Sequence, residues 1–416
     1  MNHFDYRDGM LHCEELALSK VAAAVGTPCY VYSERTILRH FRRLDEAFGD
    51  LPHLVCYAVK SNPNLGVLKV LADAGAGAEV VSGGELFRAL KVGITPVKIV
   101  FNGNGKTEAE LEYAVQSGIL MVNADSAGEL RLLNEVAGRL GRRVPIALRV
   151  NPDIDPGTHP YISTGLKKSK FGVSIENAVE CYGLARELPN LEVVGVHSHI
   201  GSQITNVEPF VESVGKLADL VEELRAAGHR IEFLDLGGGI GITYDNESPP
   251  TYEEVVEAIS PHVRRAGCTV LIEPGRSIVG NAGVLLTRVL YVKQGAEKDF
   301  VVVDTAMNDL ARPSLYGSYH AIQPVTNHAE NAETLVADVV GGICESGDFL
   351  ARDRQLPTPR QGDLLAIMSA GAYGSAMSSM YNSRPLVPEV LVSGGSFAVV
   401  RRRPSYDEMV ALESPD

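Results

Sequence analysis

The chain has 416 residues, of which 45% are hydrophobic and 22% are charged, a balance that excludes a disordered or collagen-like protein. Its net charge of −14 argues against a general nucleic-acid or anionic-membrane partner. Six cysteines lie far apart without a C-x-x-C pair, which indicates reduced thiols in a cytoplasmic protein and no metal site. The first residues lack the pattern of a signal peptide, and no apolar run approaches the ~18 residues of a membrane span. We therefore expect a soluble, cytoplasmic protein.

Eight apolar runs of strand length alternate with amphipathic stretches through the first two-thirds of the chain. They are near-continuous in Val, Ile and Leu, as buried parallel strands are, and cover 55–60, 77–81, 97–101, 119–123, 144–150, 193–199, 232–236 and 269–273. The spacing between them predicts helices over 64–74, 84–92, 107–117, 126–140 and 207–227. Eight strand–helix pairs predict an α/β fold with a (β/α)8 TIM-like barrel, and an open doubly wound sheet is the alternative.

Beyond about Ile278 the pattern changes to apolar runs separated by Gly, Pro and Asp turns. These runs predict a C-terminal β-sheet or β-barrel domain, with strands over 284–293, 300–304, 333–340, 364–368 and 389–393. The run C-Y-V-Y at 29–32 predicts a further strand of that domain. The expected organisation is an N-terminal segment 1–33 that joins the β-domain, a barrel over 34–278 and a β-domain over 279–416.

Catalytic residues of a (β/α)8 barrel lie at the carboxyl ends of its strands. Here those ends hold an amine, an imidazole, a guanidinium and a carboxylate among the residues Lys60, Ser82, Asn102, Arg149, His199, Gly237 and Glu273. A lysine that is desolvated at the end of an apolar strand becomes nucleophilic enough to form a Schiff base. Taken alone, Lys60 is more often a lysine that extends into solvent, and a single histidine such as His199 is more often structural.

A phosphate site is predicted at the ends of strands six to eight. The run Gly237, Gly238 and Gly239 lets backbone N–H groups converge on an anion, while Ser202 and Arg276 add a hydroxyl and a cation. Barrels commonly bind phosphate in this region. The segment G-N-G-K-T at 103–107 is no P-loop, because its first glycine would fall on a valine.

Glu273 completes the eighth strand. A carboxylate that faces a pyridine nitrogen keeps that nitrogen protonated, which makes pyridoxal phosphate a strong electron sink. The alternative for Glu273 is an ion pair with Arg276 at the barrel rim.

Eight motifs, in order along the chain, resemble those of the diaminopimelate decarboxylase family: Y-A-V-K-S-N-P-N, V-S-G-G-E-L, H-S-H-I-G-S-Q, D-L-G-G-G, E-P-G-R, R-P-S-L-Y-G-S-Y-H, C-E-S-G-D-F-L and G-A-Y-G. The resemblance runs from about Phe4 to Val400. The family shares its fold with alanine racemase and eukaryotic ornithine decarboxylase. Membership implies decarboxylation of meso-diaminopimelate to L-lysine and CO2, the last step of lysine biosynthesis, with pyridoxal 5'-phosphate as cofactor.

The resemblance also implies roles for residues of the barrel. Lys60 would carry the cofactor, His199 would stack on its pyridine face, and Glu273 would face its ring nitrogen. The phosphate would be held by Ser202, Gly237, Gly238, Gly239, Gly275 and Arg276.

The resemblance implies further roles for the β-domain. The substrate carboxylate would be held by Arg276, Arg312 and Tyr316, and the distal amine by Glu345. Tyr373 would lie near the cofactor, and Cys344 would be the proton donor. Since Cys344 and Glu345 reach the neighbouring subunit's site in this family, a homodimer with shared active sites is implied.

Two positions depart from the family pattern. Glu79 stands where the family commonly has Asp, and F-N-G-N-G-K-T stands where a small-residue S-G-V-G-K loop is common. Both lie outside the eight motifs, so the chemistry is expected to be intact while the contacts of these loops are left open.

Three other functions compete with this one. Decarboxylation of ornithine, arginine or carboxynorspermidine is disfavoured where the product is a plain diamine, because Arg312 would repel a second ammonium. A non-catalytic pyridoxal-phosphate carrier would resemble the barrel alone, whereas about 138 residues follow the barrel here. A racemase is disfavoured because Glu273, and not an arginine, is expected at the ring nitrogen.

Overall fold

The computed structural model describes residues 2–157, 170–327 and 333–413, and it divides into two compact units. The barrel unit comprises His40–Ile242 and Ser248–Ser277. The sheet unit comprises Met1–Arg39, Thr243–Glu247 and Ile278–Asp416. Within the described residues, no helix is both long and apolar enough to cross a membrane.

Eight parallel strands form the centre of the barrel unit: β5 (His53–Ala58), β6 (Gly77–Val80), β7 (Ile99–Phe101), β8 (Met121–Ala124), β9 (Val144–Asn151), β11 (Leu191–His197), β12 (Phe233–Asp235) and β13 (Thr269–Ile272). The last and first strands of the series meet where β13 pairs with β5, with Leu271 opposite Leu54. The pairing of β8 with β9 makes the ring continuous. The (β/α)8 barrel is therefore confirmed, and the open sheet is excluded.

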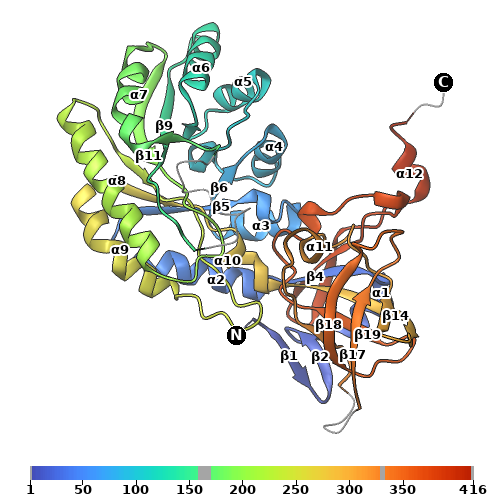
Figure 1. The fold of residues 1–416 in the computed structure, drawn as a ribbon. Helices are drawn as coiled ribbons and strands as arrows, with labels where there is room; N and C mark the ends of the chain where they lie inside the picture. The colour runs from blue at the N-terminus through green and yellow to red at the C-terminus, as the bar shows by residue number, and fades with distance from the viewer. Residues whose placement is uncertain (1, 158–169, 328–332, 414–416) are drawn as a thin grey trace. The chain divides into compact units, whose positions relative to one another are not determined.

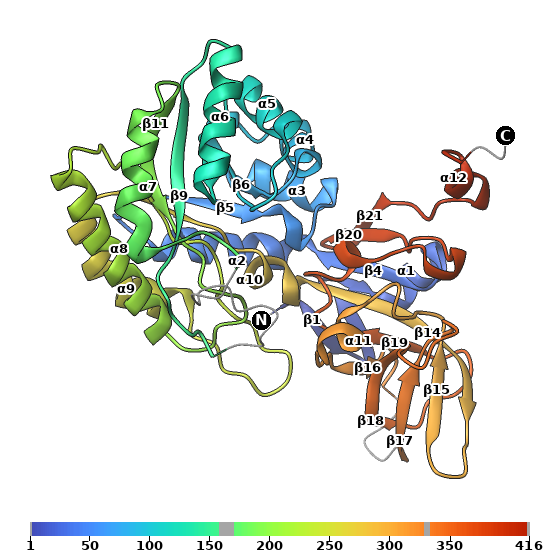
Figure 2. The same ribbon diagram turned by 45° about the horizontal axis from the view of Figure 1, so that its top comes forward.

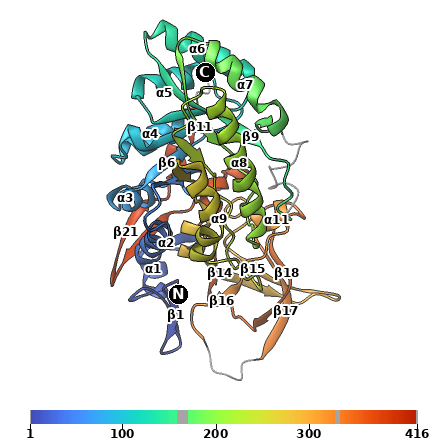
Figure 3. The ribbon, with the colours of Figure 1, turned by 90° about the vertical axis from the view of Figure 1, so that its left-hand side faces the viewer.

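A helix follows each of the first seven strands and lies on the outside of the barrel (Figures 1 and 2): α3 (Leu65–Asp73), α4 (Gly83–Lys91), α5 (Glu108–Ser117), α6 (Ala127–Arg139), α7 (Ile175–Glu187), α8 (Glu208–Ala226) and α9 (Tyr252–Ala266). Helices α8 and α9 lie side by side (Figure 3). The short two-residue strand β10 (Val173–Ser174) pairs with β9, and α10 (Arg276–Val279) follows β13. The helices predicted from spacing are confirmed. Side chains such as those of Asn64 and Thr107 cap the first turns of these helices and help to fix where they begin.

Two strands end two residues earlier than the sequence pattern predicts, and β6, β12 and β13 end one residue earlier. The strand β5 ends at Ala58, so Lys60 lies in the 3-10 turn Val59–Ser61, which the Asn62 N–H closes on the Val59 carbonyl. The strand β11 ends at His197, so His199 lies in the following loop. Apolar composition does not distinguish a strand from the buried turn after it. Both residues still lie at the carboxyl end of the barrel.

The sheet unit is built on a mixed sheet in the order β18-β17-β15-β14-β4-β20-β21. Its strands, which Figure 2 shows in part, are β4 (Cys29–Ser33), β14 (Gly283–Lys293), β15 (Asp299–Val303), β16 (Ile322–Pro324), β17 (Thr334–Val340), β18 (Phe349–Pro357), β19 (Leu364–Ile367), β20 (Glu389–Ser393) and β21 (Ser396–Arg401). The strand β19 pairs with β14 and β16. Each strand predicted in this half is confirmed.

The strand β4 inserts an N-terminal segment into this sheet, as the run at 29–32 predicts. It pairs antiparallel with β14 and parallel with β20, so that Val31 lies opposite both Val284 and Val390 in a buried apolar core. The remaining elements of the unit are β1 (Phe4–Arg7), β2 (Met10–Cys13), β3 (Leu16–Ala17), α1 (Leu18–Val25), α11 (Arg312–Tyr316) and α12 (Tyr406–Val410). The helix α2 (Glu34–Ala47) runs from the sheet unit into the barrel unit.

The lysine of the G-N-G-K-T segment is a structural residue of the barrel unit. Lys106 is buried, and its Nζ donates to the carbonyl oxygens of Gly103 and Asn123, at 2.6 and 2.9 Å. It also forms an ion pair with Glu129 of α6 at 2.7 Å. All three contacts of Lys106 Nζ hold the segment 103–107 against the barrel to which it belongs.

We predict that Lys106→Met lowers the free energy of unfolding by about 3 kcal/mol, because it leaves the Glu129 carboxylate buried without its partner. The double variant Lys106→Met/Glu129→Gln should recover most of this loss. The exposed pair of Lys69 and Asp73 gives the matched control, since Lys69→Met should cost under about 1 kcal/mol. Urea unfolding of the three variants measures these differences, and equal losses for Lys106→Met and Lys69→Met would contradict the assignment.

Candidate functional site

Lys60 is paired with a buried carboxylate at the end of the barrel. Its Nζ lies 2.7 and 2.6 Å from the two carboxylate oxygens of Glu79, which is fully buried in β6. Burial raises the pKa of Glu79 to about 7, although the charge of Lys60 opposes this shift. Glu79 lies outside the eight sequence motifs, but the structure places it in direct contact with the predicted cofactor lysine.

Two asparagines connect this ion pair with the other buried carboxyl groups. Asn102 Nδ2 donates to Glu79 Oε1 at 3.1 Å and to Glu273 Oε1 at 2.6 Å. Asn123 Nδ2 donates to Asn102 Oδ1 at 2.6 Å and to Asp235 Oδ2 at 2.9 Å. The barrel interior thus holds one continuous hydrogen-bonded network that contains three carboxyl groups.

Sequence reasoning missed two members of this network, Asn123 and Asp235. Asn123 lies inside β8, and Asp235 is the last residue of β12, one position before the predicted end of that strand. A usable signal was present, because an aspartate inside an apolar strand is buried and needs a polar partner.

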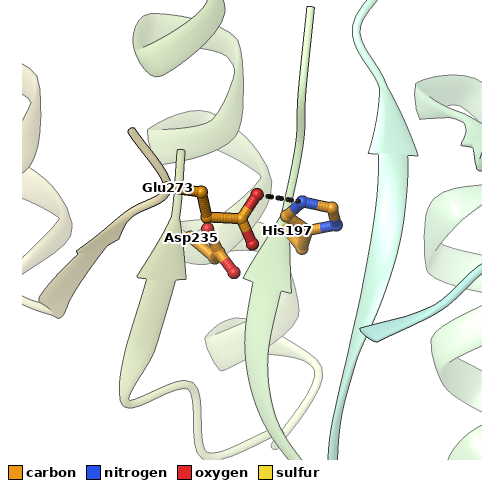
Figure 4. A group of neighbouring side chains, drawn as sticks. All are labelled: His197, Asp235 and Glu273. Carbon is orange, nitrogen blue, oxygen red and sulfur yellow. Dashed lines mark ion pairs between the residues drawn. The ribbon is translucent and has the colours of Figure 1, made fainter. Parts of the chain in front are cut away.

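His197, Asp235 and Glu273 converge on one point (Figure 4), with one ligating atom of each lying within 4.8 Å of the others. His197 Nε2 lies 3.7 Å from Glu273 Oε2. Burial, followed by the charge of Glu273, raises the pKa of Asp235 well above its usual range. Burial by itself would raise the pKa of Glu273, but the interactions with His197 and Lys60 outweigh this effect and lower that pKa. The pKa values of the two neighbouring carboxyl groups are thus shifted in opposite directions, so Asp235 binds a proton more readily than Glu273.

The glycine run after β12 packs tightly against its neighbours. A Cβ on Gly238 would lie 2.3 Å from the carbonyl oxygen of Glu273, and a Cβ on Gly239 would lie 2.6 Å from that of Gly201. Gly239 also has φ of +119°, a backbone conformation that other residues rarely adopt. Glycine is therefore required for this run to pack so closely against Glu273 and Gly201. The N–H groups of Gly237 and Gly238 donate to Asp235 Oδ1 and His199 Nδ1, at 3.1 and 3.2 Å.

Ser202 and Arg276 meet beside this run. The Arg276 guanidinium donates to Ser202 Oγ at 3.0 Å through Nη2 and at 3.3 Å through Nε, and Arg276 is buried. The Gly239 carbonyl accepts from the Ile204 N–H, which ties the loop of Ser202 to the glycine run. A buried cation and a hydroxyl thus lie beside the glycine run, and these two donors fit a phosphate group.

His199 lies beside the glycine run. Its Nδ1 accepts a hydrogen bond from the Gly238 N–H at 3.2 Å. Burial, followed by the charges of Arg149 and Lys60, lowers the pKa of His199 to about 3, so the ring is neutral. A neutral, flat imidazole suits stacking on a pyridine ring.

The predicted residue Gly275 also needs its small size, because a Cβ there would lie 2.9 Å from Ser61 Cβ.

The predicted residues of the barrel unit are thus brought together, and they fit pyridoxal phosphate in chemistry. The lysine matches the aldehyde of the cofactor, Glu273 matches the ring nitrogen, and the glycine run with Arg276 matches the phosphate.

The predicted residues of the sheet unit lie on two adjacent segments. Arg312 and Tyr316 are the first and last residues of α11, while Cys344 and Glu345 lie in the turn before β18. Ser314 Oγ of α11 donates to the carbonyl oxygen of Gly347 at 2.6 Å, which holds the two segments together.

The turn that carries Cys344 is fixed by one buried carboxylate. Asp348 accepts from the N–H groups of Ile343 and Met307, at 2.7 and 2.8 Å. Cys344 itself is exposed, with a free thiol, and its N–H donates to Asn382 Oδ1 at 3.4 Å. Tyr373 adopts φ of +57°, an uncommon backbone conformation for a tyrosine. Whether these residues share one site with Lys60 stays a prediction.

Comparisons with known proteins agree with this chemistry. The family model "Pyridoxal-dependent decarboxylase, pyridoxal binding domain" matches residues 34–280. The chain is 50% identical over 409 residues to a diaminopimelate decarboxylase of Aquifex aeolicus, covering 98% of this chain and 96% of that protein. It is 50% identical over 414 residues to that of Pseudomonas aeruginosa, covering 100% and 99%.

A solved structure agrees as well. The diaminopimelate decarboxylase from Helicobacter pylori complexed with L-lysine matches with a TM-score of 0.92 and 43% identity, covering 95% of this chain and 99% of that one. The chain therefore belongs to the diaminopimelate decarboxylase family of pyridoxal-dependent decarboxylases.

Proposed function

We propose that this protein decarboxylates meso-diaminopimelate to L-lysine and CO2 with pyridoxal 5'-phosphate as cofactor. The observation that carries the proposal is the linkage of Lys60 to the buried Glu273 through Glu79 and Asn102 in one barrel. It is supported by identities of 50% with diaminopimelate decarboxylases over essentially the whole chain. The related Helicobacter pylori enzyme was solved with L-lysine, the product proposed here.

The cofactor, when bound, supplies the electron sink that accepts the electrons left behind as CO2 departs. Glu273 would face the ring nitrogen and stabilise positive charge there, and the neutral ring of His199 would support the pyridine face. Arg276, Ser202 and the glycine run would hold the phosphate. Lys60 would hold the aldehyde end of the cofactor, and Glu79, paired with Lys60 Nζ, would accept a proton from that amine or return one to it.

The sheet unit is proposed to select the substrate and to finish the reaction. Arg276, Arg312 and Tyr316 bind the substrate carboxylate that is retained, and Glu345 binds the distal amine, with Tyr373 near the cofactor. Cys344 Sγ donates the proton that replaces the lost carboxylate. An arginine and a glutamate in one pocket match a substrate that carries both a second carboxylate and a second amine.

We also propose that the enzyme is a homodimer with shared sites and that it works in the cytoplasm. The dimer rests on the family resemblance of the Cys344 and Glu345 motif. The six free cysteines fit a reducing compartment.

The first test is substrate choice. We expect the purified protein, loaded with pyridoxal phosphate, to release CO2 from meso-diaminopimelate and far less from lysine, ornithine or arginine, which lack a second carboxylate for Arg312. Release of labelled CO2 from each substrate measures this preference. Cofactor binding without release from any of the four would favour the carrier alternative, and a preference for ornithine or arginine would favour the other decarboxylases.

A second test locates the cofactor lysine. Borohydride reduction of the loaded protein should fix the cofactor on the peptide that contains Lys60, because this amine lies at the glutamate-lined end of the barrel. Peptide mass spectrometry identifies the site. The buried Lys106 and the exposed Lys69 serve as internal controls, and a label on either one would show that Lys60 has another role.

A third test concerns the shared site. We expect inactive Lys60→Ala and inactive Cys344→Ala chains to regain about a quarter of wild-type activity when dimers exchange in a statistical mixture. In a shared-site dimer, each hybrid has one site with both defects and one site with neither. Exchange is followed by mass spectrometry of differently tagged chains. A mixture that exchanges but stays inactive would show that each site is built from one chain.

A further inference from the structure

The environment of Arg312 in the sheet unit defines the orientation of its guanidinium. Arg312 is buried, and its guanidinium lies over the ring of Tyr244, with 4.7 Å between the guanidinium carbon and the ring centroid. Nη1 lies 3.0 Å from His320 Nε2, and Nη2 donates to Ser318 Oγ at 3.3 Å. A guanidinium is planar with donors in fixed directions, so these contacts on its face and its edge define its plane.

The protonation state of His320 follows from its two partners. Its Nδ1 lies 2.8 Å from the carbonyl oxygen of Met368, which can only accept a hydrogen bond. Its Nε2 faces the Arg312 guanidinium, which can only donate. Both contacts are satisfied only when His320 is neutral with its proton on Nδ1.

The surroundings of His320 keep this arrangement rigid. His320 is fully buried, and Tyr244 packs against its ring edge-to-face, with centroids 5.4 Å apart and planes at 82°. The Arg354 guanidinium donates to the backbone carbonyl oxygen of His320 at 2.8 Å. Through these hydrogen bonds and this ring contact, the charged and titratable residues next to His320 are Arg312, Arg354 and Tyr244.

We propose that His320 is a positioning residue for substrate selection, which holds the Arg312 guanidinium in the orientation that receives the retained carboxylate of the substrate. This inference rests on the proposed function, in which Arg312 binds that carboxylate. It extends the function to a residue that does not touch the substrate and that acts only through Arg312.

Two ligands isolate the interaction. L-lysine keeps the retained carboxylate, whereas cadaverine has the same carbon chain and amines without it. The wild type should bind L-lysine more tightly than cadaverine, and a variant that loses the orientation of Arg312 should lose this preference. Calorimetric titration of the protein loaded with pyridoxal phosphate measures both Kd values without relying on turnover.

Two substitutions separate the contact with Arg312 from the contact with Met368. His320→Gln places an amide oxygen near the position of Nε2, so it keeps an acceptor for Arg312. His320→Asn places its amide near the position of Nδ1, so it keeps only a donor for Met368. The two variants are of similar polarity and each keeps one hydrogen bond.

We expect His320→Asn to weaken L-lysine binding by about tenfold, as for a lost charge-assisted hydrogen bond, with the Kd of cadaverine unchanged. KM for meso-diaminopimelate should rise by a similar factor, and kcat should change by less than about threefold. His320→Gln should retain most of the wild-type preference.

Three results would overturn the proposal: a wild type that binds both ligands equally, a His320→Asn variant that keeps the preference, or a loss of affinity for both ligands alike. The last result would assign His320 a purely structural role. Failure of the proposed function is seen separately, as a wild type that releases no CO2 from meso-diaminopimelate.

Discussion

The burial of three carboxyl groups at one end of the barrel is the constraint on which the site depends. A carboxylate removed from water is costly unless it is paired and hydrogen-bonded. Glu79 of β6, Asp235 of β12 and Glu273, which directly follows β13, are all buried at this end of the closed ring. Lys60 pairs with Glu79, and the side-chain amides of Asn102 and Asn123 donate to all three carboxyl groups. Removing Lys60 or either asparagine would leave a buried carboxyl group without one of its partners and would shift its pKa.

This network explains why the barrel unit is prepared for a cofactor before one binds. The interactions with His197 and Lys60 lower the pKa of Glu273, whereas burial raises the pKa of Asp235. His199 is neutral because burial and the charges of Arg149 and Lys60 lower its pKa to about 3. The electrostatic state that a protonated pyridine ring requires is therefore set by the protein. The close packing of Gly238 and Gly239 holds the segment proposed to bind the phosphate against the same strand ends.

In the sheet unit the buried charge is a cation, the guanidinium of Arg312. Arg312 is stabilised by the ring of Tyr244 and by the neutral acceptors His320 and Ser318. Tyr244 comes from the segment Thr243–Glu247, which lies in sequence between the last two barrel strands but belongs by its contacts to the sheet unit. This five-residue segment thus supplies the ring that packs on Arg312, the residue proposed to bind the retained carboxylate of the substrate.

The sequence by itself determined the barrel strands, the mixed sheet with its N-terminal strand, and the barrel residues that fit a cofactor, because buried strands leave local apolar runs and because the motifs stand at their ends. It did not determine the partners of those residues. Asn123 and Asp235 are 112 positions apart, and Arg312 and Tyr244 are 68 positions apart, so no local pattern signals either contact. Only closure of the barrel and folding of the sheet unit bring these residues together, and the pKa shifts of the buried carboxyl groups follow from that burial.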